Sequence, residues 1–223
     1  MTALVTAGPT YEAIDPVRFI GNHSSGLMGF VVAEELARNG AKVTLVTGPT
    51  HLMTANSNIK RMDVISSDDM YKACVREFKK ADITVMAAAV ADFTPGSVAS
   101  QKIKKAKGEF NLKLKPSKDI LSELGKSKRK GQVLVGFALE TDNEMENAVK
   151  KLNNKNLDFI VLNSLKDNGT GFGHHTNKIT IIDKKNEIAK FELKQKTEVA
   201  KDVVDKILEL KIRNSELRKN LYA

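Results

Sequence analysis

Cysteine, tryptophan and long apolar runs are scarce or missing in this 223-residue sequence. The single cysteine, Cys74, excludes an intramolecular disulfide and a cysteine-based zinc site. No apolar run approaches the roughly 20 residues needed to cross a bilayer, and the first residues lack the basic and apolar regions of a signal peptide. These absences lead us to expect a globular protein of the reducing cytoplasm, with no membrane partner.

Aromatic residues make up only 5% of the chain, so stacking platforms for single-stranded nucleic acid are scarce. The formal charge is nevertheless +9, from 36 Lys and Arg against 27 Asp and Glu, which favours anionic partners. The basic residues are spread along the chain, apart from a cluster at Lys102, Lys104, Lys105 and Lys107. We therefore expect polyphosphate substrates and no nucleic-acid partner, and we keep a basic nucleic-acid-binding module as the alternative of another class.

Short apolar segments alternate with amphipathic ones along the chain. Apolar runs predict strands at 3–6, 42–47, 83–88, 133–138 and 159–163. Alternation of apolar and polar residues predicts a strand at 59–64 and a half-exposed strand at 110–115. Caps and amphipathic spacing predict helices at 26–39, 68–80 after Ser67, 117–126, 142–154 and from Thr197 onward. This order predicts an α/β fold, a Rossmann-like doubly wound and mostly parallel sheet with an added antiparallel hairpin at 178–193. We expect one domain over residues 1–223, with about the last ten residues frayed.

Two loops rich in small residues are expected at the binding edge, because ligands of such sheets lie beyond the carboxyl ends of the strands. One follows the first strand at 7–10, and the other, at 21–29, leads into the first helix. Free backbone N–H groups at a helix N-terminus bind phosphate. Alternatively, Gly26 and Gly29 only permit close packing of helix on sheet, and the local spacing does not decide between the two.

Two common nucleotide-binding motifs do not match this sequence. The spacing from Gly21 to Gly26 imitates a Walker loop, but Leu27 stands where the phosphate-binding lysine belongs and Met28 where a hydroxyl would hold magnesium. A dinucleotide fingerprint would follow the first strand directly, whereas these glycines come a long loop too late. The sequence therefore disfavours a nicotinamide oxidoreductase.

The lysine cluster and an alanine-rich segment at 86–93, which ends the 83–88 strand, are candidates for nucleotide contacts. Small side chains let a base approach the backbone, and the carboxylate of Asp92 would suit ribose hydroxyls, although tight packing and a capped turn explain the same pattern. Lysines serve as mobile charges for a triphosphate, although a solvated basic loop explains the cluster more simply. Cys74 shares a helical face with core residues, and His174 and His175 point opposite ways on an extended chain, so we expect neither a nucleophile nor a protein metal site.

Taken together, short segments along nearly the whole chain resemble one family, the phosphopantothenate–cysteine ligases. Their order and spacing carry the likeness, and they lie at residues 5–10, 15–20, 22–26, 29–30, 43–46, 88–92, 102–105, 118–120, 135–138, 140–141, 155–158 and 163. Such ligases often form the C-terminal half of a bifunctional bacterial flavoprotein. Since the chain starts directly at the first strand, we expect the flavin-dependent decarboxylase half to be absent, in a stand-alone ligase or an excised domain.

The resemblance implies a two-step ligation in coenzyme A biosynthesis. The carboxylate of 4′-phosphopantothenate attacks the α-phosphorus of CTP, giving an acyl-cytidylate and pyrophosphate. The amine of L-cysteine then displaces CMP and forms 4′-phosphopantothenoylcysteine. Mg²⁺ is expected with the triphosphate, and the same ligation with ATP is the main alternative. The resemblance also implies a homodimer with the substrate site near the subunit interface, and a flavin-dependent decarboxylase as a domain or partner.

Carried over residue by residue, the resemblance assigns catalytic roles to two side chains. Asn22 would be the amide donor near the acyl phosphate, and Lys102 would neutralise the triphosphate. The nucleotide pocket would be completed by Met86, Ala87, Ala88, Asp92, Lys118, Asp119, Ile120, Leu121, Phe137, Lys151 and Lys155. Gly8, Ser24, Ser25 and Gly26 would form the phosphate and substrate loops, and residues 104–108 a lid. Leu27 departs from the family, in which a lysine is common at this position.

Overall fold

The computed structural model describes residues 1–105, 108–164 and 170–219, with the backbone alone for 214–219. Its main sheet contains β1 (Thr2–Ala7), β4 (Lys42–Thr47), β5 (Ile59–Asp63), β6 (Ile83–Met86), β9 (Val133–Glu140), β10 (Phe159–Ser164), β12 (Ile179–Asp183) and β13 (Ile188–Lys190). The spatial order is β13-β12-β10-β9-β6-β1-β4-β5. The six strands from β10 to β5 run parallel, while β12 and β13 are antiparallel. The predicted doubly wound, mostly parallel sheet with an added hairpin is confirmed.

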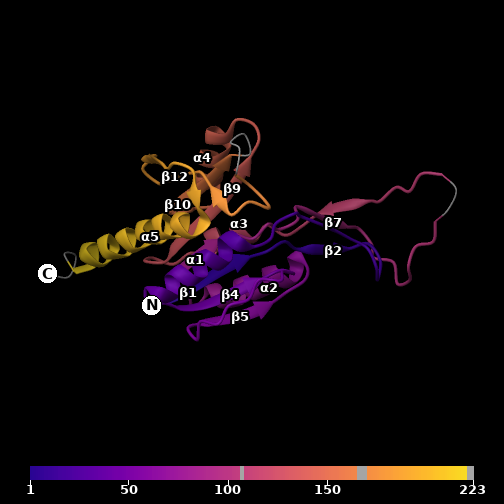
Figure 1. Cartoon of the computed structure of the whole chain (residues 1–223), viewed down its shortest axis with the longest axis horizontal. Helices are drawn as coiled ribbons and strands as arrows, with labels where there is room; N and C mark the ends of the chain where they lie inside the picture. The colour runs from indigo at the N-terminus through magenta and orange to yellow at the C-terminus, as the bar shows by residue number, and fades with distance from the viewer. Residues whose placement is uncertain (106–107, 165–169, 220–223) are drawn as a thin grey trace.

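Helices cover both faces of this sheet (Figure 1). One face carries α1 (Leu27–Arg38) and α5 (Lys196–Lys219), and the other carries α2 (Ser67–Phe78), α3 (Ile120–Ser127) and α4 (Glu144–Asn154). Neighbouring residues of one strand serve opposite faces: Val5 packs with α1 and α5, and Leu4 with the other three helices. Strands buried on both sides need continuous apolar runs, which is why these strands were predicted from sequence. No helix in the described ranges combines the length and apolarity that a bilayer crossing requires.

Several helix ends differ from the prediction. Helix α2 is capped by Ser66, not Ser67, because the Ser66 hydroxyl accepts a hydrogen bond from the amide of Asp69 at 3.2 Å. Helix α3 is capped by Asp119, two residues after the predicted Ser117, and its carboxylate accepts from the amide of Ser122 at 2.8 Å. Both stretches offer several capping side chains, so composition alone cannot select one.

Helix α5 forms the end of the described chain. It continues to Lys219, well into the last ten residues of the chain, while residues 220–223 lie outside the described ranges. The extension consists largely of Glu, Leu, Arg and Lys, residue types with high helix propensity.

The polar loops contain two small antiparallel pairs outside the main sheet. The predicted strand at 110–115 forms only β8 (Leu114–Pro116), which pairs with β7 (Phe93–Pro95). The loop before the first helix contains β2 (Tyr11–Ala13) and β3 (Phe19–Gly21), a pair that the sequence did not predict. Figure 1 shows β7 and the segment after it extending away from the sheet, alongside β2. The part of the chain from β7 to β8 is called the arm. A third short pair joins β11 (Thr176–Asn177) to β14 (Lys194–Gln195).

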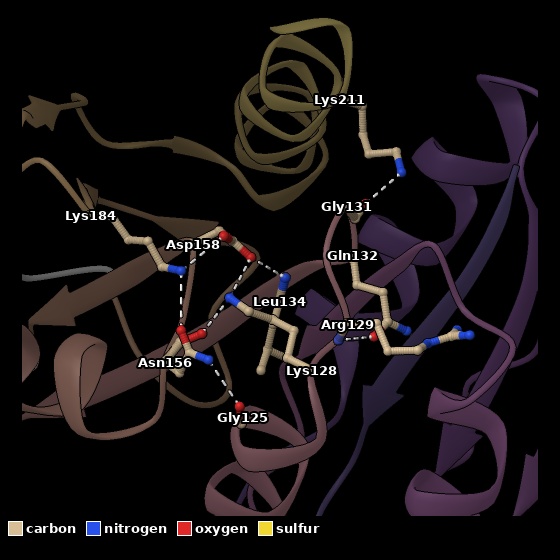
Figure 2. A network of polar contacts seen from close by, with 10 residues as sticks. All are labelled: Gly125, Lys128, Arg129, Gly131, Gln132, Leu134, Asn156, Asp158, Lys184 and Lys211. Atoms are coloured by element: carbon tan, nitrogen blue, oxygen red, sulfur yellow. Dashed lines mark hydrogen bonds and ion pairs between the residues drawn. The ribbon is translucent and has the colours of Figure 1, made fainter. Parts of the chain in front are cut away.

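A polar network ties the amino ends of β9 and β10 to the end of α3 and the β12–β13 turn (Figure 2). The carboxylate of Asp158 accepts from the amide of Leu134 at 2.7 Å and pairs with Lys128 at 3.1 Å and Lys184 at 3.3 Å. The Lys128 side chain is only 8% exposed and also donates to the carbonyl of Asn156. Burial, together with the neighbouring Lys184, lowers the pKa of Lys128 to about 8. Asp158 therefore supplies the counter-charge of a largely buried ammonium, at the sheet edge opposite the strand ends where ligands are expected.

Replacing Asp158 by alanine should lower the free energy of unfolding by about 3 kcal/mol, because the ammonium of Lys128 and the amide of Leu134 both lose their acceptor. Urea unfolding followed by circular dichroism measures this change. Lys185→Ala, at an exposed position of the same turn, should stay within about 0.5 kcal/mol of the parent. An Asp158→Ala chain as stable as the parent would show that the network contributes nothing net.

Candidate active site

Two adjoining cavities lie beyond the carboxyl ends of the parallel strands. The first, of about 400 Å³, lies beside α3 and is called the α3 cavity. The second, of about 230 Å³, lies at the start of α1 and is called the α1 cavity. Both are lined by Ala88, Val90, Asp92, Phe137 and Lys151, so they form one continuous two-part site. This is the edge of the sheet where the sequence predicted ligand binding.

The α3 cavity brings together most residues that were assigned to the nucleotide. They are Met86, Ala88, Asp92, Lys118, Asp119, Ile120, Leu121, Phe137, Lys151 and Lys155. Ala87 lines the α1 cavity instead. Val90, Ala91 and Ser117 also line the α3 cavity and were not predicted. Because these residues come from separate segments along the chain, only the folded sheet brings them to one place.

Lysines of α4 give the α3 cavity a positive wall. The ammonium of Lys151 donates to the carbonyl of Phe137 at 2.8 Å, and Lys155 pairs with Asp119 at 2.5 Å. Burial lowers the pKa of Lys151, and the nearby carboxylates of Glu140 and Asp92 offset only part of this effect. Burial alone would raise the pKa of Asp119, but the hydrogen bonds from Lys155 and a backbone amide outweigh it and lower the pKa. The wall thus presents ammonium groups and an ionised carboxylate side by side.

The alanine segment after β6 is held by two buried threonines. The hydroxyl oxygen of Thr6 accepts from the amides of Ala87 and Ala88, both at 3.1 Å. The hydroxyl oxygen of Thr10 accepts from the amide of Ala91 at 2.9 Å. These bonds take backbone donors that a longer strand would use, so β6 ends two residues earlier than predicted. The segment then runs along both cavities, and its small side chains leave the backbone accessible.

The start of α1 forms one wall of the α1 cavity through Ser24, Ser25 and Gly26. Gly26 has a φ of +85°, and a Cβ atom there would lie 2.9 Å from the amide nitrogen of Gly8. A Cβ atom at Gly29 would lie 2.6 Å from the Ala7 side chain. Close packing of helix on sheet is therefore confirmed for Gly29, whereas Gly26, the residue before α1, packs against Gly8 in the loop after β1 and lines the cavity. Gly8 contacts Gly26 through its backbone but lines neither cavity.

Asn22 lies next to the α1 cavity. Its side-chain amide donates to the carbonyl of Ala89 at 3.1 Å, and Ala89 lines that cavity. The side chain of Asn22 is otherwise exposed, as a group that meets a substrate must be.

Lys102 lies on the arm and lines neither cavity of its own chain. The next residue, Ile103, is anchored through its backbone: its amide donates to Asp15 at 3.1 Å and its carbonyl accepts from Arg18 at 2.9 Å. Lys102 itself is exposed. The predicted lid at 104–108 includes residues 106 and 107, which lie outside the described residues, and Lys107 of the lysine cluster falls there too.

The α1 cavity has further lining residues that the sequence did not assign: Asn163, Gly171, Phe172, Asn177 and Lys196. Asn177 is buried, and its side-chain amide donates to the side-chain oxygen of Asn163 at 3.0 Å. Asn163 directly follows a buried apolar run, a position that marks it as a candidate. Nothing local marks Lys196, which lies at a helix start far along the chain. Gly169, the first glycine of this loop, is outside the described residues.

Cys74 is fully buried, and burial raises the pKa of its thiol to about 12, which confirms a core position. Within residues 1–105, 108–164 and 170–219, no three His, Cys, Asp or Glu side chains are grouped so that they could hold a metal ion.

A family model described as "DNA/pantothenate metabolism flavoprotein C-terminal domain" matches residues 1–210. The chain belongs to this family. A protein of an unknown prokaryotic organism, named cysteine/cysteine sulfinic acid decarboxylase, is 58% identical over 206 residues, which cover 92% of this chain and 57% of that protein. The coenzyme A biosynthesis bifunctional protein CoaBC of Bacillus subtilis (strain 168) is 44% identical over 213 residues, covering 96% of this chain and 52% of CoaBC. The chain thus spans about half the length of these curated relatives.

The fold of the family is seen directly in a solved relative. The crystal structure of the C-terminal domain of the coenzyme A biosynthesis bifunctional protein CoaBC matches with a TM-score of 0.78 at 39% identity. The match covers 94% of this chain and 96% of that domain. This chain therefore shares its Rossmann-like fold with that domain.

Thr6→Val should lower the free energy of unfolding by about 2 kcal/mol, because it keeps the side-chain shape and leaves the amides of Ala87 and Ala88 without their acceptor. Thr6→Ser keeps the hydroxyl and should recover most of this loss. Chemical denaturation of the three chains gives the comparison. Equal stability of the valine and serine variants would mean that the two hydrogen bonds do not hold the alanine segment.

Proposed function

We propose that the chain is a cytoplasmic phosphopantothenate–cysteine ligase of coenzyme A biosynthesis that uses CTP through an acyl-cytidylate. One observation carries the proposal: ten residues assigned to the nucleotide, from separate segments, line the single α3 cavity. Family membership and the relation to CoaBC support it. The decarboxylase name of the other relative belongs to a longer protein, of which this chain covers 57%. A flavin-dependent decarboxylase domain or partner accordingly forms part of the proposal.

The two cavities divide the nucleotide between them. The base would lie in the α3 cavity against the small side chains of Ala88 and Ala91 and the ring of Phe137. Asp92, which lines both cavities, would accept hydrogen bonds from the ribose hydroxyls. The phosphates then extend into the α1 cavity, toward the backbone amides at the start of α1. In this arrangement the α-phosphorus lies near the junction of the two cavities, within reach of the carboxylate that attacks it.

The chemistry needs charge stabilisation rather than a protein nucleophile. Attack of the carboxylate forms a bond to the α-phosphorus and breaks the bond to pyrophosphate, and attack of the cysteine amine then breaks the acyl–phosphate bond and releases CMP. Asn22 donates a hydrogen bond to the acyl phosphate, and the ammonium groups of the site stabilise the developing negative charge. The α1 cavity offers amides and hydroxyls rather than a carboxylate cage, which fits Mg²⁺ carried by the triphosphate. When bound, Mg²⁺ neutralises phosphate charge.

A homodimer completes the proposal. Lys102 is exposed on the arm, outside the cavities of its own chain, although the first step needs a cation at the triphosphate. The arm also exposes large apolar side chains, with Phe93 at 52% and Phe110 at 59% exposure. A second copy that covers this apolar surface would place the arm lysine of one subunit at the site of the other. The proposed dimer thus accounts for both features of the arm.

The nucleotide preference is tested with phosphopantothenate, L-cysteine and either CTP or ATP, by measuring pyrophosphate release. We expect kcat/KM to be at least about tenfold higher with CTP, a difference of about 1.4 kcal/mol in transition-state binding. Equal or better turnover with ATP would replace CTP by ATP in the proposal. If no pyrophosphate is released with either CTP or ATP, the ligase function is excluded. A nucleic-acid-binding module would instead bind duplex or single strands with an affinity that falls steeply with salt.

Asn22→Asp and Lys102→Gln should block different steps. The Asn22→Asp chain should release about one equivalent of pyrophosphate and retain acyl-cytidylate, while product formation falls by about 10²-fold. The Lys102→Gln chain should lose acyl-cytidylate formation itself by a similar factor. Rapid quench with labelled CTP separates the two steps. Lys113→Gln, an exposed lysine of the same arm, serves as the matched control and should keep parental rates.

Mixing the two variants tests the dimer. If Lys102 acts on the partner's site, heterodimers contain one site with both native residues, so the mixture should regain activity that neither variant has alone. Parental turnover by Asn22→Asp would remove Asn22 from catalysis. Normal acyl-cytidylate formation by Lys102→Gln would remove Lys102 from the first step, and a mixture no more active than its parts would contradict the exchange of arms.

A further inference from the structure

Lys196 is a buried cation whose ammonium is bound by backbone carbonyls. It is the first residue of α5, and it is 6% exposed. Its ammonium donates to the carbonyls of Gly171 at 3.1 Å and His174 at 2.6 Å. No carboxylate in the described part of the chain forms an ion pair with it. Among the described residues, the partners of its charge are these two carbonyl dipoles.

This placement is costly on two counts. A buried charge loses its hydration, and a carbonyl pair restores only part of that loss. A positive side chain at the first residue of a helix also opposes the helix dipole, whose N-terminal end is itself positive. Burial lowers the pKa of Lys196, and no neighbouring carboxylate offsets this effect. An anion bound next to the ammonium would remove both penalties.

The α1 cavity is where such an anion fits. Lys196 lines this cavity together with Asn163 and Asn177, and the start of α1 lines it as well. The helix N-terminus brings no cation of its own, because Leu27 stands where a phosphate-binding lysine of a Walker loop would stand. Lys151, the other lysine of the lining, is shared with the α3 cavity. Among the described lining residues, Lys196 is therefore the lysine that belongs to the α1 cavity and not to the α3 cavity.

We propose that Lys196 is the cation of a phosphate subsite in the α1 cavity, where it binds a phosphate group together with the backbone amides at the start of α1. By holding the turn from Gly171 to His174, it also fixes the wall that carries Phe172. The subsite deepens the proposed function, on which the source of the phosphate rests. That phosphate belongs either to the nucleotide or to the 4′-phosphate of the acyl substrate.

The subsite is tested first without any ligase reaction, by calorimetric titration of the full chain with pyrophosphate. We expect the parent to bind, Lys196→Gln to bind at least about tenfold more weakly, and Lys196→Arg to keep most of the affinity. Lys201→Gln, an exposed lysine on the same helix, is the matched control and should bind as the parent does. Thermal unfolding of each chain verifies that it is folded. Parental affinity in Lys196→Gln, or no pyrophosphate binding by the parent, would overturn the proposal.

A change at Leu27 keeps the test decisive if Lys196→Gln does not fold. Leu27→Lys in the parent adds a third ammonium to the α1 cavity, beside those of Lys151 and Lys196, and should tighten pyrophosphate binding several-fold. In the Lys196→Gln chain the same change should restore binding. Unchanged or weaker binding on adding Leu27→Lys to the parent would contradict an anion in this cavity.

Steady-state kinetics then identify the source of the phosphate. Loss of Lys196 should raise the KM of one substrate more than that of the other, for CTP if the nucleotide phosphates occupy the subsite and for phosphopantothenate if the 4′-phosphate does. A fall in kcat with both KM values unchanged would contradict a binding role. If the parent binds pyrophosphate through Lys196 but makes no ligated product, the proposed function fails while the subsite stands.

Discussion

The hydrogen bonds accepted by the Thr6 hydroxyl shape this site more than any other single contact. Thr6 lies on β1, which pairs with β4 on one side and β6 on the other, so its side chain is fixed in the interior of the sheet. By accepting from the amides of Ala87 and Ala88, it ends β6 and sends the alanine segment along both cavities. A buried hydroxyl that satisfies two consecutive amides holds the backbone without adding a side chain to the cavities. The alanine segment of the site is therefore held in place by an interior strand of the sheet.

The positive charge of the chain acts through its position rather than through its total. Most of the lysine excess is solvated, where water and salt screen it. Lys151 and Lys196 differ, because burial lowers the pKa of each and leaves each ammonium with carbonyl acceptors. A partly desolvated cation interacts with a phosphate far more strongly than an exposed one. The two cavities thus concentrate a small part of the charge where the proposed triphosphate would lie.

The arm and the sheet have different relations to the site. The α3 and α1 cavities are built from strand ends and from helices packed on the sheet, whereas Lys102 is carried on the arm, which is held near it through the backbone of Ile103 and the Asp15–Arg18 pair. Because Lys102 lies on a projecting segment, its ammonium can reach a site independently of the residues that line the two cavities. This separation is the physical basis for proposing that two copies share a site.

The sequence by itself determined the fold class, nearly every strand of the main sheet and the helices that pack on it. Strands buried on both faces need unbroken apolar runs, and amphipathic helices need apolar residues spaced at the helical period. Resemblance added the residues that meet in the α3 cavity. Only the tertiary structure decided where β6 ends, since the threonine that ends it lies 81 residues away in the chain. It also decided that β8 pairs outside the main sheet, and that Lys196 reaches the α1 cavity. The spacing of apolar residues along a segment indicates its burial and its secondary structure. Strand pairing and cavity walls depend instead on contacts between residues that are distant in sequence.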